Sequence, residues 1–126
     1  MYVKPCICPK SKGYWKNHPE AWPVEKIEVG NVIYSKREAI GILGGANSKD
    51  ATRMQLAQLI AAKLNRLCGA SSVFKYADKT INVDDVIADA ELFLGKYPLG
   101  SNPQGSARQE ALGLKDLLDV YNNQGE

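Results

Sequence analysis

The sequence predicts a mainly α-helical fold: a compact bundle of about four helices with one small β-hairpin and an irregular N-terminal segment rich in proline and tryptophan. Three observations predict it. Apolar residues recur at helical spacing in four stretches, and β-branched residues flank Gly30-Asn31. In addition, Pro5, Pro9, Pro19 and Pro23 crowd the start of the chain.

The chain is expected to form a single domain, residues 1–126. Its length is near the commonest size for one domain, and 44% hydrophobic and 24% charged residues are ordinary for a globular protein. Within the domain we assign residues 1–25 to an irregular N-terminal segment packed on the helices, 26–35 to the hairpin and 36–123 to the helical part. The sequence contains no internal repeat that we can recognise.

The N-terminal segment is predicted to be irregular because its prolines are too closely spaced for a helix of any length. With few ladder hydrogen bonds, such a segment must be held by its side chains. The hairpin follows: Gly30-Asn31 between two β-branched runs is typical of a tight two-residue turn with Gly at a positive φ.

Capping residues and apolar stripes predict the helices. Ser35 and Glu38 form a capping box for a short helix that ends at Gly44-Gly45. The clearest helix runs from about Lys49 to Cys68 and ends at Gly69, a natural C-terminal cap. Its stripe consists of Leu56, Leu59, Ile60, Leu64 and Leu67.

Two further helices follow in the second half of the chain. Phe74 and Tyr76 are placed in a loop, after which Asn82 is expected to cap a helix that ends at Gly95 and Pro98. Ser106 is expected to cap the last helix, which frays after Tyr121.

Charge and hydropathy narrow the classes of function. The net charge is only +2, and basic residues are spread along the chain among acidic ones, so no nucleic-acid partner is predicted. A local excess of lysine near the start is interpreted as a solvated segment. No apolar run approaches the roughly 18 residues of a membrane span, so no membrane insertion is expected. The chain also opens without the apolar stretch of a secretory signal, and because such a signal is removed on export, its absence is compatible with an extracellular location.

Three cysteines are candidates for a disulfide. Cys6 and Cys8 flank one residue and would need strain to bond to each other, so a bridge from either of them to Cys68 is more plausible. The bridge would close a loop of about 60 residues and contribute about 4 kcal/mol to the free energy of unfolding. One thiol would be left for an intermolecular link.

The stretch Gly13–Pro23 concentrates the aromatic and polar residues from which a binding site could be built. It contains both tryptophans, the only histidine and two of the six prolines. Trp15, His18, Glu20 and Trp22 are the candidate ligand-binding residues, because aromatic faces stack on sugar rings while polar groups anchor a ligand. The alternative, which we favour, is that the indoles are buried and hold the segment in place.

No catalytic residue, metal site or cofactor is predicted. A catalytic triad would have to use His18, and no nucleophile motif accompanies it. Cys6 and Cys8 lack the usual spacing of zinc ligands. The run from Asp78 to Asp85 has too few oxygen ligands for calcium and is interpreted as helix capping.

The run Cys8-x4-Gly-Tyr-Trp-Lys-Asn-His-Pro-Glu-Ala-Trp-Pro23 resembles the opening of a domain of unassigned function in secreted and cell-surface multidomain proteins of bacteria and archaea. The resemblance continues through Gly30–Lys36, Leu59–Asn65 and Leu114–Asn123. It implies an extracellular or cell-surface location and an accessory role. The family pattern has one cysteine at Cys8, whereas this chain adds Cys6, and Ser11-Lys12 stands where Thr-Gln is common.

We therefore expect a non-enzymatic extracellular module for surface display, adhesion or assembly. Its expected partner is an extracellular polymer or a neighbouring surface protein. One alternative is a glycan- or small-molecule-binding domain that uses the Trp15–Trp22 loop, for which exposed indoles would be required. A second is a self-assembling subunit of a surface filament, linked through the spare cysteine.

Overall fold

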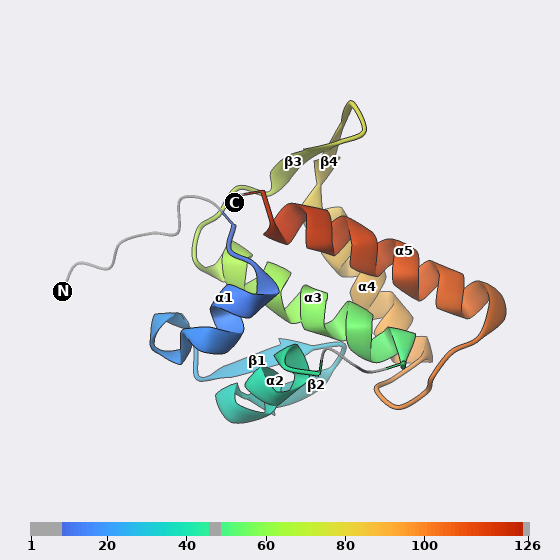
Figure 1. The fold of residues 1–126 in the computed structure, drawn as a ribbon, viewed down its shortest axis with the longest axis horizontal. Helices are drawn as coiled ribbons and strands as arrows, with labels where there is room; N and C mark the ends of the chain where they lie inside the picture. Colours follow the sequence, from blue (N-terminus) through green and yellow to red (C-terminus); the bar gives the residue numbers. More distant parts are fainter. Residues whose placement is uncertain (1–8, 46–48, 125–126) are drawn as a thin grey trace.

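The computed structural model describes residues 9–45 and 49–124. Within these ranges it contains five α-helices, one 3-10 helix and two separate antiparallel two-stranded sheets (Figure 1). The elements are α1 (Lys12–Asn17), η1 (Pro19–Ala21), β1 (Lys26–Val29), β2 (Val32–Ser35), α2 (Lys36–Leu43), α3 (Ala51–Leu67), β3 (Val73–Tyr76), β4 (Lys79–Asn82), α4 (Val83–Lys96) and α5 (Gly105–Asn122).

The expected fold of four helices, one hairpin and an irregular start is wrong. The N-terminal segment contains α1, which fits between Pro9 and Pro19 and begins after Ser11. The Ser11 side chain accepts a hydrogen bond from the Tyr14 amide, so a serine cap makes a helix of six residues possible despite the prolines. Pro19 then begins η1, where its missing N–H is not needed.

A second hairpin, β3–β4, replaces the expected loop around Phe74 and Tyr76. Its two-residue turn is Ala77-Asp78, and both residues have a positive φ, 49° and 66°. Glycine and asparagine are the residues that usually signal such a turn, so alanine at the first position hid the hairpin from sequence analysis.

The same hairpin-to-helix unit occurs twice. In each hairpin four residues of one strand pair with four of the next, and the last strand residue, Ser35 or Asn82, caps the following helix. The turns also match, since Gly30-Asn31 have φ values of 57° and 68°. The two units share this backbone geometry although their residues differ, which is why no repeat is visible in the sequence.

Helix α3 is the centre of the molecule and contacts all four other α-helices (Figure 1). Four leucines and isoleucines of the predicted stripe are fully buried, but Leu67 is 55% exposed. The opposite face is buried as well, and it carries Gln55, Gln58 and Asn65. Because both faces are covered, the helix is much less amphipathic than a surface helix.

The local predictions for the other elements are mostly confirmed. The first hairpin spans Lys26–Ser35, and the capping box of Ser35 and Glu38 is present with both hydrogen bonds. Asn82 caps α4 through its side chain, as expected. The cap predicted for α5 is wrong: the helix begins at Gly105, one residue before Ser106, and Gln104 stands at the N-cap without a side-chain hydrogen bond.

Candidate functional site

Both indoles of the Gly13–Pro23 stretch are buried. Trp15 on α1 is 1% exposed and Trp22 is 7% exposed. The Trp22 Nε1 donates to the main-chain oxygen of Trp15 at 2.8 Å, so the Trp22 indole is fixed to the backbone of α1. The Trp15 Nε1 donates to the Asn65 Oδ1 on α3 at 3.1 Å. These aromatic faces contribute to the core and are not available to a ligand at the surface.

Asn65 joins the N-terminal segment to the central helix. Its Oδ1 accepts from the Lys10 amide at 2.8 Å as well as from Trp15. Its Nδ2 donates to the Lys10 carbonyl at 2.9 Å. The Asn65 side chain thus satisfies both the N–H and the carbonyl of Lys10, as the backbone of a neighbouring strand would do in a β-sheet.

The hydrogen-bond network continues from Asn65 into α5. The Asn65 Nδ2 also donates to the Asn122 Oδ1 at 3.0 Å, and the Asn122 Nδ2 donates to the Gln58 Oε1 at 2.8 Å. All three amides are buried. Gln55, one turn before Gln58, is different: it is fully buried, and its amide has no hydrogen-bond partner in residues 9–45 and 49–124.

His18 and Glu20 lie together on the surface. The His18 Nδ1 and the Glu20 Oε2 are 3.0 Å apart, and the side chains are 47% and 71% exposed. The imidazole stacks on the Tyr14 ring with 4.4 Å between centroids. The pKa of Glu20 is lowered by a hydrogen bond from its own backbone amide and then by the bond from His18.

The four predicted site residues therefore form two pairs with different surroundings. Trp15 and Trp22 are buried together, while His18 and Glu20 are exposed together. The two pairs do not present one exposed binding face.

An open hollow lies next to this region. It has a volume of about 440 Å³ and is lined by Glu25, Ser35, Lys36, Arg37 and Ile40. The Lys36 Nζ is held by the Pro19 carbonyl at 2.9 Å and by the Glu25 carboxylate at 3.3 Å. Lys36 therefore lines the hollow and also holds the main chain of η1 beside it.

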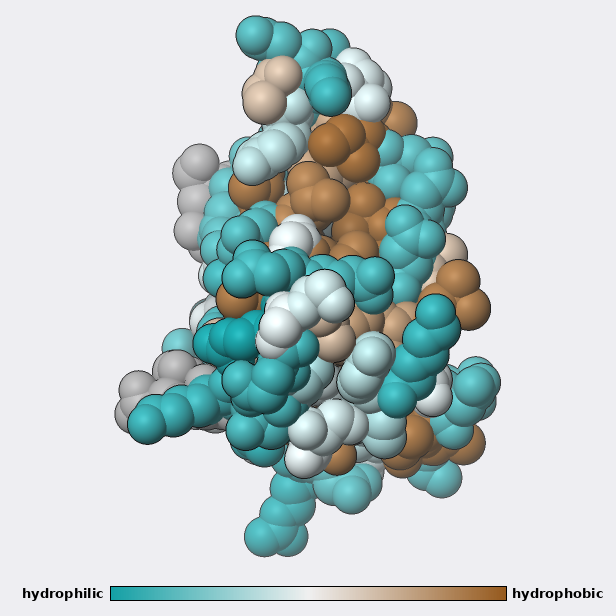
Figure 2. Space-filling view, turned by 90° about the vertical axis from the view of Figure 1, so that its right-hand side faces the viewer, coloured by the Kyte–Doolittle hydropathy of each residue, from teal (hydrophilic) through white to brown (hydrophobic). Residues whose placement is uncertain are grey.

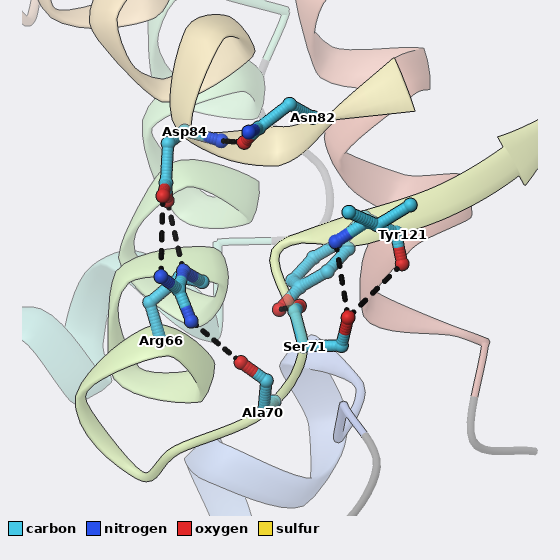
Figure 3. A network of polar contacts seen from close by, with 7 residues as sticks. Arg66, Ala70, Ser71, Asn82, Asp84 and Tyr121 are labelled. Atoms are coloured by element: carbon cyan, nitrogen blue, oxygen red, sulfur yellow. Dashed lines mark hydrogen bonds and ion pairs between the residues drawn. The ribbon is translucent and has the colours of Figure 1, made fainter. Parts of the chain in front are cut away.

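The base of the second hairpin is fixed by a polar network, shown in Figure 3. The Arg66 guanidinium binds both carboxylate oxygens of Asp84, at 2.8 and 3.1 Å, and donates to the Ala70 carbonyl at 2.6 Å. The Tyr121 hydroxyl donates to the Ser71 carbonyl at 2.6 Å. These contacts hold the base, while all six residues from Lys75 to Thr80 are exposed.

Apolar side chains gather below the tip of this hairpin, on the face that Figure 2 shows. The half-buried apolar residues of this part of the molecule include Ile81 on β4, Ile87 on α4 and Leu117 on α5. A protein this small rarely leaves a large apolar patch uncovered without a binding partner.

The cysteine predictions fall partly outside the described residues. Cys6 and Cys8 lie in the N-terminal residues that the structure does not describe. Cys68 is the C-cap of α3, is half-buried, and donates its amide to the Leu64 carbonyl.

In residues 9–45 and 49–124, no three His, Cys, Asp or Glu side chains form a group suited to a metal ion. In the same ranges, no helix combines the length and apolar character needed to cross a bilayer.

We compared the chain with known protein families, curated proteins and solved structures, and none of these comparisons found a match. The resemblance of Cys8–Pro23 to secreted surface domains therefore stays a prediction.

Sequence reasoning missed the amide network. Gln55, Gln58 and Asn65 share one face of α3, but polar residues opposite a leucine stripe are usually exposed. Two features of the sequence indicate that α3 is buried on both faces: its length, and its alanines Ala57, Ala61 and Ala62, which allow neighbouring helices to approach closely.

Proposed function

We propose that this chain is a non-enzymatic extracellular module for surface display, adhesion or assembly, with its N-terminal segment fastened to the helical body by a disulfide. The observation that carries the proposal is the double hydrogen bond between the Lys10 backbone and the Asn65 side chain. It brings Lys10 to the last turn of α3, the helix whose C-cap is Cys68.

Chain geometry puts a bridge within reach. Asn65 precedes Cys68 by three residues of continuous helical backbone, a rise of about 4.5 Å. From Lys10 back to Cys8 the chain spans at most about 7 Å, and Cys6 adds about 7 Å more. Because bridged α-carbons lie about 4.4–6.8 Å apart, Cys8 can meet Cys68, and Cys6 remains the alternative partner. Structural disulfides of this kind form in oxidising compartments outside the cytosol.

The hydrogen bonds of the two buried indoles support a structural role for the stretch Gly13–Pro23. Trp15, Trp22 and Asn65 all take part in attaching the N-terminal segment, so the most distinctive residues of the sequence stabilise the module itself. Glycan binding through the two indoles gains no support, since both are buried. Adhesion or assembly would instead use apolar surface such as that in Figure 2.

Non-reducing peptide mapping by mass spectrometry of the exported protein tests this proposal. We expect a peptide pair that joins Cys68 to Cys8 or to Cys6. As matched controls, Cys6→Ser and Cys8→Ser should differ: only loss of the bridged cysteine lowers the free energy of unfolding, by about 4 kcal/mol. Three free thiols after export would contradict the proposal.

A further inference from the structure

Helix α4 presents an exposed face that its own fold does not use. Leu92 is 70% exposed, more than the other large apolar residues that the structure describes. Asp85 and Asp89 share its face at helical spacing, are exposed, and have no hydrogen-bond or ion-pair partner among the described residues. Acids on the other faces differ: Asp84 binds Arg66 and Glu91 binds Lys63 at 2.7 Å.

Small residues flank Leu92 on one side, and Asp89 and Lys96 flank it on the other. Ala88 lies one turn before it and Gly95 one turn after it. A Cβ added at Gly95 would meet nothing within 4 Å, so no internal packing requires glycine there. Glycine inside a helix costs about 1 kcal/mol relative to alanine. Because Ala88 and Gly95 have little or no side chain, another backbone can approach the helix closely on that side of Leu92.

Helix α2 offers a complementary surface. The hollow beside it is lined by Ile40, which is half-buried, and by Arg37, which is exposed and has no hydrogen-bond or ion-pair partner among the described residues. Gly41, next to Ile40, is also a helix-interior glycine with nothing within 4 Å of an added Cβ. Glu25 and Lys36 of the lining are ion-paired with each other, so Arg37 supplies the uncompensated charge of this surface. That guanidinium and the apolar lining match the two acids and the leucine of α4.

The two surfaces cannot meet within one chain. Both helices pack on α3, and Figure 1 shows α2 below α3 and α4 behind it. We propose that the α2 hollow of one copy receives the α4 face of a second copy, with Leu92 entering beside Ile40 and Arg37 facing Asp85 and Asp89. Such a contact joins two different surfaces, so it repeats from copy to copy and builds a closed ring or an open chain. This inference rests on the proposed function and specifies its assembly role.

Sedimentation velocity of the exported protein, from micromolar to millimolar concentration and with and without reductant, tests the inference. The wild type should associate reversibly in both conditions. Gly41→Leu should weaken association at least about tenfold, because Gly41 lies one turn after Arg37 and its new side chain would stand between the guanidinium and the second copy, while the fold has space for it. Gly113→Leu on α5 is the matched control: it also has open space, and its association should equal that of the wild type.

Charge exchange tests the specific pairing. Arg37→Glu should weaken association about tenfold, and the combination of Arg37→Glu with Asp89→Arg should restore it. A monomeric wild type, equal effects of Gly41→Leu and Gly113→Leu, or association that reductant abolishes would each overturn the inference. A monomer that still contains the intrachain bridge overturns this inference alone, whereas free thiols overturn the proposed function.

Discussion

Asn65 is the residue on which the position of the N-terminal segment depends most. Its side chain satisfies the Trp15 indole, both main-chain groups of Lys10 and the Asn122 amide. Asn65→Leu keeps the volume but leaves these buried groups without partners. We expect it to lower the free energy of unfolding by about 3 kcal/mol, measured by urea denaturation. Asn17→Ala, at the exposed end of α1, should change it by less than about 0.5 kcal/mol.

Gln55 on the same helix should respond in the opposite direction. Its amide is fully buried and makes no hydrogen bond to any residue that the structure describes, so it loses hydration without compensation. Gln55→Met keeps the length of the side chain and removes that cost. We expect it to raise the free energy of unfolding by about 1 kcal/mol in the same denaturation experiment. A loss of stability as large as that of Asn65→Leu would show that the Gln55 amide does have a polar partner.

Glu38 makes the stability of α2 depend on pH. Hydrogen bonds from the Ser35 backbone amide, and then from the Ser35 side chain, lower the pKa of Glu38 below 4.5. A carboxylate with a lowered folded pKa stabilises the fold above pH 4.5, and this contribution is lost as the pH falls through the folded pKa.

The variant Glu38→Gln tests this dependence. Near neutral pH the wild type should be the more stable protein, and the difference should disappear as the pH falls well below 4.5. Urea denaturation of both proteins across this range measures it. A difference that does not change with pH would rule out the carboxylate as its source.

At the scale of elements, turn residues determined what the sequence could predict. The hairpin Lys26–Ser35 was predictable because Gly30-Asn31 is a strong turn signal. The hairpin Val73–Asn82 was not, because Ala77 adopts a positive φ that tertiary contacts at the hairpin base must maintain. Helix α1 was not predicted because the spacing of the prolines indicates an irregular segment, and a single serine cap is a weak sign of a helix of six residues.

Gly30 is required by the turn and by a neighbouring helix. Its φ is +57°, and an added Cβ would lie 2.8 Å from the Leu94 Cβ on α4. Gly105 has a similar φ of +60° but open space around it. Gly105→Ala should therefore cost about 1 kcal/mol, for backbone strain alone, and Gly30→Ala at least about 2 kcal/mol. Thermal unfolding of both variants measures the difference, and equal costs would show that Leu94 moves away freely.

At the scale of the whole molecule, the sequence indicated which residues of the N-terminal segment are buried but not what they are buried against. The indoles were favoured as structural because a proline-rich segment needs bulky side chains to hold it. The partner of the Trp15 indole, Asn65, lies 50 positions further along the chain, and nothing in the local pattern distinguishes it from an exposed polar residue. Long-range pairing of single side chains leaves no periodic signal.

The central claim is that the aromatic stretch fastens the N-terminal segment to the helical body. Hydrogen exchange at the two indole N–H groups, followed by ¹H–¹⁵N NMR, tests it most directly. Both groups are buried donors, to Asn65 and to the Trp15 carbonyl, so both should exchange orders of magnitude more slowly than a free indole. Asn65→Leu should remove the protection of Trp15 first. Two indoles that exchange at the rate of free tryptophan would contradict the account.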